Sequence, residues 1–121
     1  MSKQSITYQQ SEHIPRHTDW KPLRIEGISM KNLHQFEEGG STVLIKMEPN
    51  SSFPLHNHEA EEEVYVVEGE VKVGKYHLEQ GDYLFTSPET IHAPFSRKGC
   101  ILLATTRKPL KFLNKKEDQS R

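Results

Sequence analysis

The sequence predicts an all-β domain, built as a sandwich or barrel of short strands. Turn-forming residues recur roughly every 5–15 residues between Gly39 and Gly99, a rhythm typical of such folds. The segments between the turns are rich in β-branched and aromatic residues, and none shows the sustained period of an amphipathic helix. Apolar residues make up only 33% of the chain, which suits a thin β-fold better than a helical bundle.

The strand pattern begins at Thr42–Met47, which places alternate apolar side chains on one face. Val64–Val67 stops just before Gly69 and Val71–Val73 follows at once, so a hairpin across Gly69 is expected. The remaining expected strands are Tyr83–Phe85, Ile91–Phe95 and Cys100–Thr106.

Side chains in these strands are expected to form the core. That expectation covers the strand aromatics Tyr65, Tyr83, Phe85 and Phe95, and it makes Cys100 a small buried hydrophobe rather than a nucleophile. Surface positions are expected for four histidines that lie outside any motif: His13, His17, His34 and His77.

The length of 121 residues suits one domain. We expect an N-terminal arm over 1–20, a barrel over 21–113 and a polar tail over 114–121. The polar start shows no secretory signal, and the longest purely apolar run, Ile101–Ala104, is far too short to span a membrane.

The composition excludes several classes of function. Sixteen Lys and Arg against 17 Asp and Glu give a net charge of −1, which argues against nucleic-acid binding by a basic face. The single cysteine, Cys100, excludes an internal disulfide and a multi-cysteine zinc site. A protein of the cytoplasm, with no nucleic-acid or membrane partner, is therefore expected.

Histidines and acids in two segments point to a metal site. His56 and His58 are two residues apart, so on an extended chain both rings face the same way. Glu62 enters the next strand on the face of Val64, and His92 stands on another expected strand. Imidazoles with one carboxylate suit zinc, iron, manganese, nickel or copper better than calcium or magnesium. The alternative is an ordinary surface loop followed by a solvated acidic run.

Two motifs resemble those of the cupin superfamily. His56-x-His58, three residues, Glu62, six residues and Gly69 resembles the first motif, and Gly81 with His92 eleven positions later resembles the second. The resemblance implies a double-stranded β-helix, the cupin jelly-roll barrel, with His56, His58, Glu62 and His92 around one divalent transition metal. Three positions depart from the family pattern, and none of them is a ligand in the family: Ser87, Glu89 and Ser96.

Flanking residues are also similar to the cupin domain of ChrR-like anti-sigma factors and to related single-domain dioxygenase-like cupins. The residues that carry this similarity are Trp20-Lys21-Pro22, Gly27-Ile28, Lys31, Leu33, His92-Ala93-Pro94 and Gly99-Cys100. The N-terminal domain with which those factors grip a sigma factor has no counterpart here, so anti-sigma activity is not expected.

The resemblance implies a small-molecule substrate or ligand, and two classes of function stay open. One is a dioxygenase acting on a small enolisable or phenolic compound. The other is a non-catalytic ligand-binding or sensor module. A sugar-type isomerase is a third, weaker idea, because such cupins often need no metal. Pairing of barrel sheets into a homodimer is also implied.

Overall fold

The structure is a computed structural model that describes residues 11–113. The first ten residues of the expected arm, and the whole tail expected over 114–121, lie outside the described residues. Every regular element in the described part is a strand, which confirms the all-β prediction. No helix in residues 11–113 is long and apolar enough to cross a membrane.

Twelve strands make up the described chain. In chain order they are β1 (Lys21–Pro22), β2 (Ile28–Gln35), β3 (Ser41–Met47), β4 (Ser51–Ser52), β5 (His56–His58), β6 (Glu62–Val73), β7 (Tyr76–Glu79), β8 (Tyr83–Thr86), β9 (Ile91–His92), β10 (Phe95–Ser96), β11 (Cys100–Thr106) and β12 (Leu110–Phe112).

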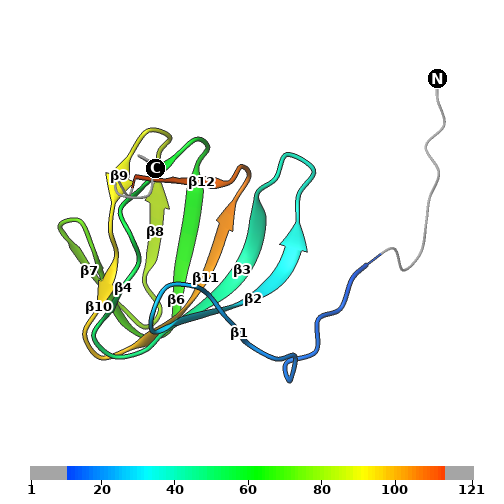
Figure 1. Cartoon of the computed structure of the whole chain (residues 1–121), viewed down its shortest axis with the longest axis horizontal. Helices are drawn as coiled ribbons and strands as arrows, with labels where there is room; N and C mark the ends of the chain where they lie inside the picture. Colours follow the sequence, from blue (N-terminus) through cyan, green and yellow to red (C-terminus); the bar gives the residue numbers. More distant parts are fainter. Residues whose placement is uncertain (1–10, 114–121) are drawn as a thin grey trace.

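The strands form one large curled sheet and one small sheet. The large sheet has the order β1-β2-β3-β11-β6-β10-β4, with β7 and β8 also pairing with β6. The small sheet has the order β12-β5-β9. In Figure 1, β2, β3, β11, β6 and β8 stand side by side as one curved wall, and β12 crosses the upper end of the fold.

The long strand β6 continues through Gly69, so the hairpin predicted there is wrong. Gly69 has a φ of 83° and lies so close to the Gly99 carbonyl that a side chain would collide with it. Glycine at this position lets the strand bend from its pairing with β11 to its pairing with β7. The chain reverses five residues later, at Gly74, whose φ is 61°.

The core lies inside the curl and is made by alternate residues of the central strands. The fully or nearly buried apolar residues include Val64, Val66, Val71 and Val73 on β6, Leu102 and Ala104 on β11, and Val43 and Met47 on β3. Cys100 belongs to the same cluster, as predicted.

The four aromatics expected in the core lie outside it. Tyr65, Tyr83, Phe85 and Phe95 are all exposed. Because side chains alternate along a strand, the inward positions on β6 and β8 go to Val64, Val66, Leu84 and Thr86, and the aromatics take the outward ones. The prediction was wrong because it relied on residue type, whereas the register of a strand determines which side chains face the core.

Candidate metal centre

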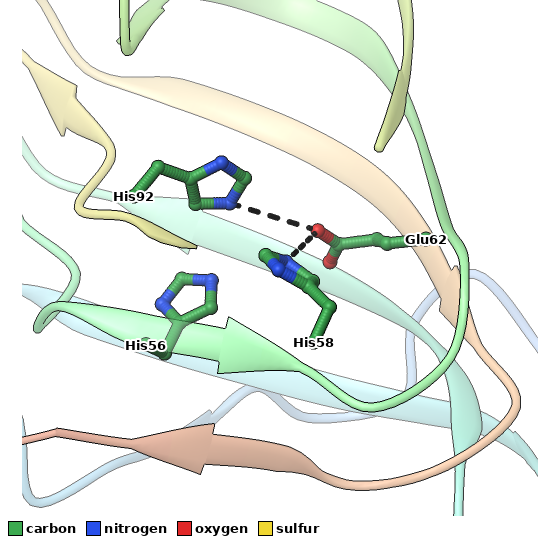
Figure 2. Close-up of side chains that lie close together, drawn as sticks. All are labelled: His56, His58, Glu62 and His92. Atoms are coloured by element: carbon green, nitrogen blue, oxygen red, sulfur yellow. Dashed lines mark hydrogen bonds and ion pairs between the residues drawn. The ribbon is translucent and has the colours of Figure 1, made fainter. Parts of the chain in front are cut away.

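Four side chains from three segments meet inside the curl. His56 and His58 come from β5, Glu62 from the start of β6 and His92 from β9. One ligand atom from each lies within 4.8 Å of all the others, and all four side chains are buried. Figure 2 shows the three rings and the carboxylate pointing toward a common centre. These are the four residues that the sequence singled out.

Strand alternation brings the first two rings together. His56 and His58 are 2% and 0% exposed, while Asn57 between them faces the other way and donates to the Glu89 carboxylate. Antiparallel pairing of β5 with β9 then sets His92 directly opposite His56. The short strand β12 pairs with the other edge of β5, so His56 sits in the middle of the small sheet.

Backbone carbonyls orient two of the rings. His56 Nδ1 donates to the Pro54 carbonyl at 2.8 Å, and His58 Nδ1 donates to the Thr90 carbonyl at 2.6 Å. A carbonyl can only accept, so the proton must reside on Nδ1 in both rings. The Nε2 atoms are then the ones that can bind a metal, which in His58 would replace the proton shared with Glu62.

Glu62 completes the cluster from β6. Its Oε1 lies 2.9 Å from His58 Nε2 and 3.9 Å from His92 Nε2. Two atoms each about 2.1 Å from one first-row metal lie about 3 Å apart when adjacent and about 4 Å apart when opposite. These two distances and the donor types fit one divalent transition metal, which would draw the most widely spaced ligand atoms, up to 4.8 Å apart, slightly closer together.

The neighbouring glutamate behaves differently. Glu62 is buried on the face of Val64 and Val66, whereas Glu63 is exposed and accepts a hydrogen bond from the Tyr83 hydroxyl at 2.9 Å. The predicted register of this strand is confirmed. The four histidines predicted on the surface, His13, His17, His34 and His77, are indeed exposed.

Burial decides the protonation of two rings. It lowers the pKa of His92 to about 4, and the neighbouring His56 and His58 add to that effect. Burial also lowers the pKa of His56. For His58 burial acts in the same direction, but its hydrogen bonds to Glu62 and to the Thr90 carbonyl outweigh it and leave the pKa raised. His56 and His92 are thus neutral at pH 7 and keep a lone pair for a metal.

A mainly apolar cavity of about 450 Å³ reaches the cluster at Glu62. Its walls include Met30 on β2, Val43 on β3, Ala104 on β11 and Phe112 on β12. Arg24, Ser41 and Thr106 are its other polar or charged members besides Glu62. A hollow of similar size, about 480 Å³, lies around Glu70 and His77 and touches none of the four cluster residues.

The aromatic surroundings of His56 were missed by sequence reasoning. The rings of Phe53 and Phe112 lie 5.5 Å and 5.7 Å from the His56 ring, centroid to centroid. Phe112 comes from β12, a strand that was not predicted because its segment, Leu110–Phe112, is only three residues long. Leu110 and Phe112, two apolar residues that alternate with Lys111 after the second motif, were the sequence signal for this strand.

Comparison with known proteins agrees with this arrangement. The model of a family described as the ChrR cupin-like domain matches residues 9–110. No curated protein is similar enough in sequence to count as a match.

Solved structures share the fold. An acetylacetone dioxygenase from Acinetobacter johnsonii is 21% identical, with 94% of this chain and 85% of that one covered and a TM-score of 0.80. The polyketide cyclase RemF from Streptomyces resistomycificus is 19% identical, with 89% of each chain covered and a TM-score of 0.71.

A chain in the Rhodobacter sphaeroides complex of SigE with the anti-sigma ChrR is 22% identical, with a TM-score of 0.67. The match covers 75% of this chain and half of that one. At these identities the likeness shows the fold alone, and the predicted double-stranded β-helix is confirmed.

Proposed function

This chain belongs to the family of ChrR cupin-like domains, and we propose that it is a metal-dependent dioxygenase of small enolisable or phenolic compounds. In this proposal His56, His58, Glu62 and His92 hold one divalent transition metal. The reaction requires a redox-active metal, which excludes zinc and leaves iron, manganese, nickel and copper from the candidate set, and iron is the first of these to test.

The observation that carries the proposal is the contact between the cluster and the apolar cavity. A purely structural metal site is closed by its protein ligands, whereas a catalytic one keeps a position open toward the substrate. Here Glu62 belongs both to the cluster and to the wall of the 450 Å³ cavity. A cavity of that size and lining suits a small, largely apolar organic molecule.

The chain's own residues would do three things in this reaction. The carbonyls of Pro54 and Thr90 keep His56 and His58 in one orientation. Glu62 supplies the only negative charge of the cluster, which favours a cationic centre in a buried place. The apolar cavity walls would contact the apolar part of a substrate and leave its polar end to face the cluster. When bound, iron would supply the oxidation chemistry.

A second candidate is a non-catalytic ligand-binding module. It is favoured by the likeness to a chain in the complex of SigE with the anti-sigma ChrR, since an anti-sigma protein acts by binding. The same cluster and cavity would then orient a ligand without turning it over.

Two measurements on protein purified without a histidine tag separate these candidates. Elemental analysis gives the metal content, and oxygen uptake is followed after iron loading with a panel of diketones and phenols. The dioxygenase proposal predicts oxygen consumption only when a chelating compound is present. A compound that raises the melting temperature of both the iron and the zinc forms, with no oxygen uptake by the iron form, would favour the binding module instead.

A further inference from the structure

The cavity beside the metal cluster has a polar row on one wall, which strand register sets in place. Thr106 on β11 pairs with Glu62 on β6 and with Ser41 on β3. All three residues line the cavity. One strand spacing, about 4.8 Å, separates the backbone of Thr106 from that of Glu62, and a second separates Ser41 from Thr106. The polar row therefore leads from the cluster along the cavity wall.

The two hydroxyl groups of this row face the cavity. Alternation turns Thr106 to the same side of β11 as the buried Ala104, and Ser41 to the same side of β3 as the buried Val43. Within residues 11–113, neither hydroxyl takes part in a side-chain hydrogen bond. Thr105, which faces the other way, shares its hydroxyl hydrogen bond with a side chain of β3. The inward hydroxyls are thus available to a bound molecule.

Arg24 adds a positive charge at the mouth of the cavity. Its neighbours Leu23 and Ile25 are partly buried against the core, whereas Arg24 itself is exposed. All three line the cavity. None of the ion pairs or side-chain hydrogen bonds formed within residues 11–113 involves Arg24. Within the described chain, its five N–H donors are therefore left for a ligand.

The polar lining of the cavity is suited to one kind of ligand. Besides the metal ligand Glu62, the charged and hydroxyl side chains that line it are Arg24, Ser41 and Thr106. All three can donate a hydrogen bond, and the single charge among them is positive. No second acid among the described residues lines the cavity. A carboxylate would supply both the acceptor oxygens and the negative charge, and its planar shape matches a guanidinium.

We propose that the compound bound in this cavity is an acid, whose enolisable or phenolic end faces the metal cluster and whose carboxylate faces Arg24. The hydroxyls of Thr106 and Ser41 donate hydrogen bonds to its oxygens, and the apolar walls contact its carbon chain. A volume of about 450 Å³ leaves room for two functional groups joined by several carbons. This inference rests on the proposed function, because it names the substrate class of the same site.

Calorimetric titration of the zinc-loaded protein with succinylacetone and with its methyl ester tests the proposal. Succinylacetone joins a β-diketone to a carboxylate, and the ester keeps the diketone but lacks the charge. The wild type should bind the acid about tenfold more tightly than the ester, and Arg24→Gln should bring this ratio close to one. Arg97→Gln is the matched control and should keep the ratio, because Arg97 is an exposed arginine that lines the other hollow.

A second pair of variants tests the polar row. Thr106→Val removes the inward hydroxyl and keeps the branched shape, so the affinity for succinylacetone should fall about threefold or more. Thr105→Val makes the same change on the outward face of the same strand and should leave that affinity unchanged. Thermal melts check that each variant is folded. Equal losses of affinity in the two folded variants would contradict the role of the row.

The outcomes separate this inference from the proposed function. Equal affinity of the wild type for acid and ester would overturn the acid proposal, as would no binding of either compound. An acid preference that persists in Arg24→Gln would also overturn it, because the carboxylate would then lie at the metal. An acid preference that depends on Arg24 supports it whether or not the iron form consumes oxygen. Absence of oxygen uptake with every compound would count against the dioxygenase alone.

Discussion

His58 Nδ1 donates a hydrogen bond to the Thr90 carbonyl, 2.6 Å away and two residues before His92. This bond ties the strand of the first two histidines to the segment that carries the third. Pairing of His56 with His92 across β5 and β9 makes the same connection through the backbone. The rings are therefore held by main-chain groups, and replacing one ring should leave the positions of the others largely intact.

Removing a cluster histidine should remove the metal. We expect wild-type protein to bind one transition metal per chain, and His58→Ala or His92→Ala to weaken that binding about 100-fold or more. His77→Ala serves as the control, because His77 is exposed on β7 and bonds to Glu70. Metal content after dialysis measures the effect. Equal metal loss in the His77 variant would contradict the assignment of ligands.

The same substitution at the neighbouring residues Glu62 and Glu63 should affect metal binding at the first and leave it almost unchanged at the second. Glu62→Gln removes the only anionic group of the cluster, so zinc affinity should fall about tenfold or more. Glu63→Gln should alter it little, because Glu63 lies on the outer face and bonds to Tyr83. Calorimetric titration of both variants gives the comparison. The reverse order of effects would mean that the strand register is shifted by one residue.

Metal affinity should fall in acid. A ligating imidazole must be neutral, so protons compete with the metal. The raised pKa of His58, a result of its contacts with Glu62 and Thr90, makes it the first ring to take up a proton. His92, with a pKa of about 4, follows only in strong acid. Zinc affinity should drop about tenfold per pH unit once His58 titrates. A flat profile from about pH 8 to pH 5 would argue against histidine ligation.

Glu70 should contribute stability that depends on its charge. Its carboxylate accepts hydrogen bonds from the backbone N–H groups of Lys98 and Arg97 and from His77, and the Lys98 bond is the largest cause of its lowered pKa. Its side chain is only 12% exposed. Glu70→Gln should therefore cost about 1–3 kcal/mol in the free energy of unfolding near pH 7.

The pH dependence of that loss follows from the direction of the shift. The pKa of Glu70 is lower in the folded state than in the unfolded state. The stabilisation is therefore fully present at a pH above the ordinary pKa of glutamate, and it is lost as the pH falls through the pKa of the folded state. Urea unfolding of wild type and Glu70→Gln should converge in acid. Glu79→Gln, at a side chain that is 71% exposed, is the control and should change little.

Two glycines with positive φ should differ in their tolerance of alanine. Gly69→Ala must place a methyl group against the Gly99 carbonyl, so we expect a loss of about 3 kcal/mol or more. Nothing lies within 4 Å of the position that a Gly74 side chain would take. Gly74→Ala should therefore cost only the backbone strain, about 1–2 kcal/mol. Denaturant midpoints measure both, and equal losses would contradict the collision at Gly69.

The sequence was sufficient for the fold class and for the cluster. Cys100–Thr106 is a strand with the predicted bounds, and the two-residue alternation at His56 and His58 led directly to their common face. These features are local, because alternation and turn chemistry act over a few residues. The same alternation placed Glu62 inward and Glu63 outward.

Two of the wrong strand predictions concern features that depend on contacts between residues far apart in the sequence. Gly69 is a typical turn residue, and only its approach to Gly99 makes it a bend inside one strand. The segment Ile91–Phe95, predicted as one strand, divides into β9 and β10 because its two ends pair in different sheets. The outward position of Tyr65 is an error of another kind, because the alternation that turns Glu63 outward also turns Tyr65 outward, and the prediction gave residue type more weight than register.

The place of β11 in the large sheet has a consequence for synthesis on the ribosome. β11 lies between β3 and β6, and its register runs along the full length of β3. Until Thr106 has left the exit tunnel, β3 and β6 cannot join, and both strands keep an unpaired edge. A nascent chain whose β11 is not yet free to pair is therefore exposed to aggregation. We expect ribosome-bound chains ending before Cys100 to be protease-sensitive and to need a chaperone, and release of the last strands to trigger folding in one step.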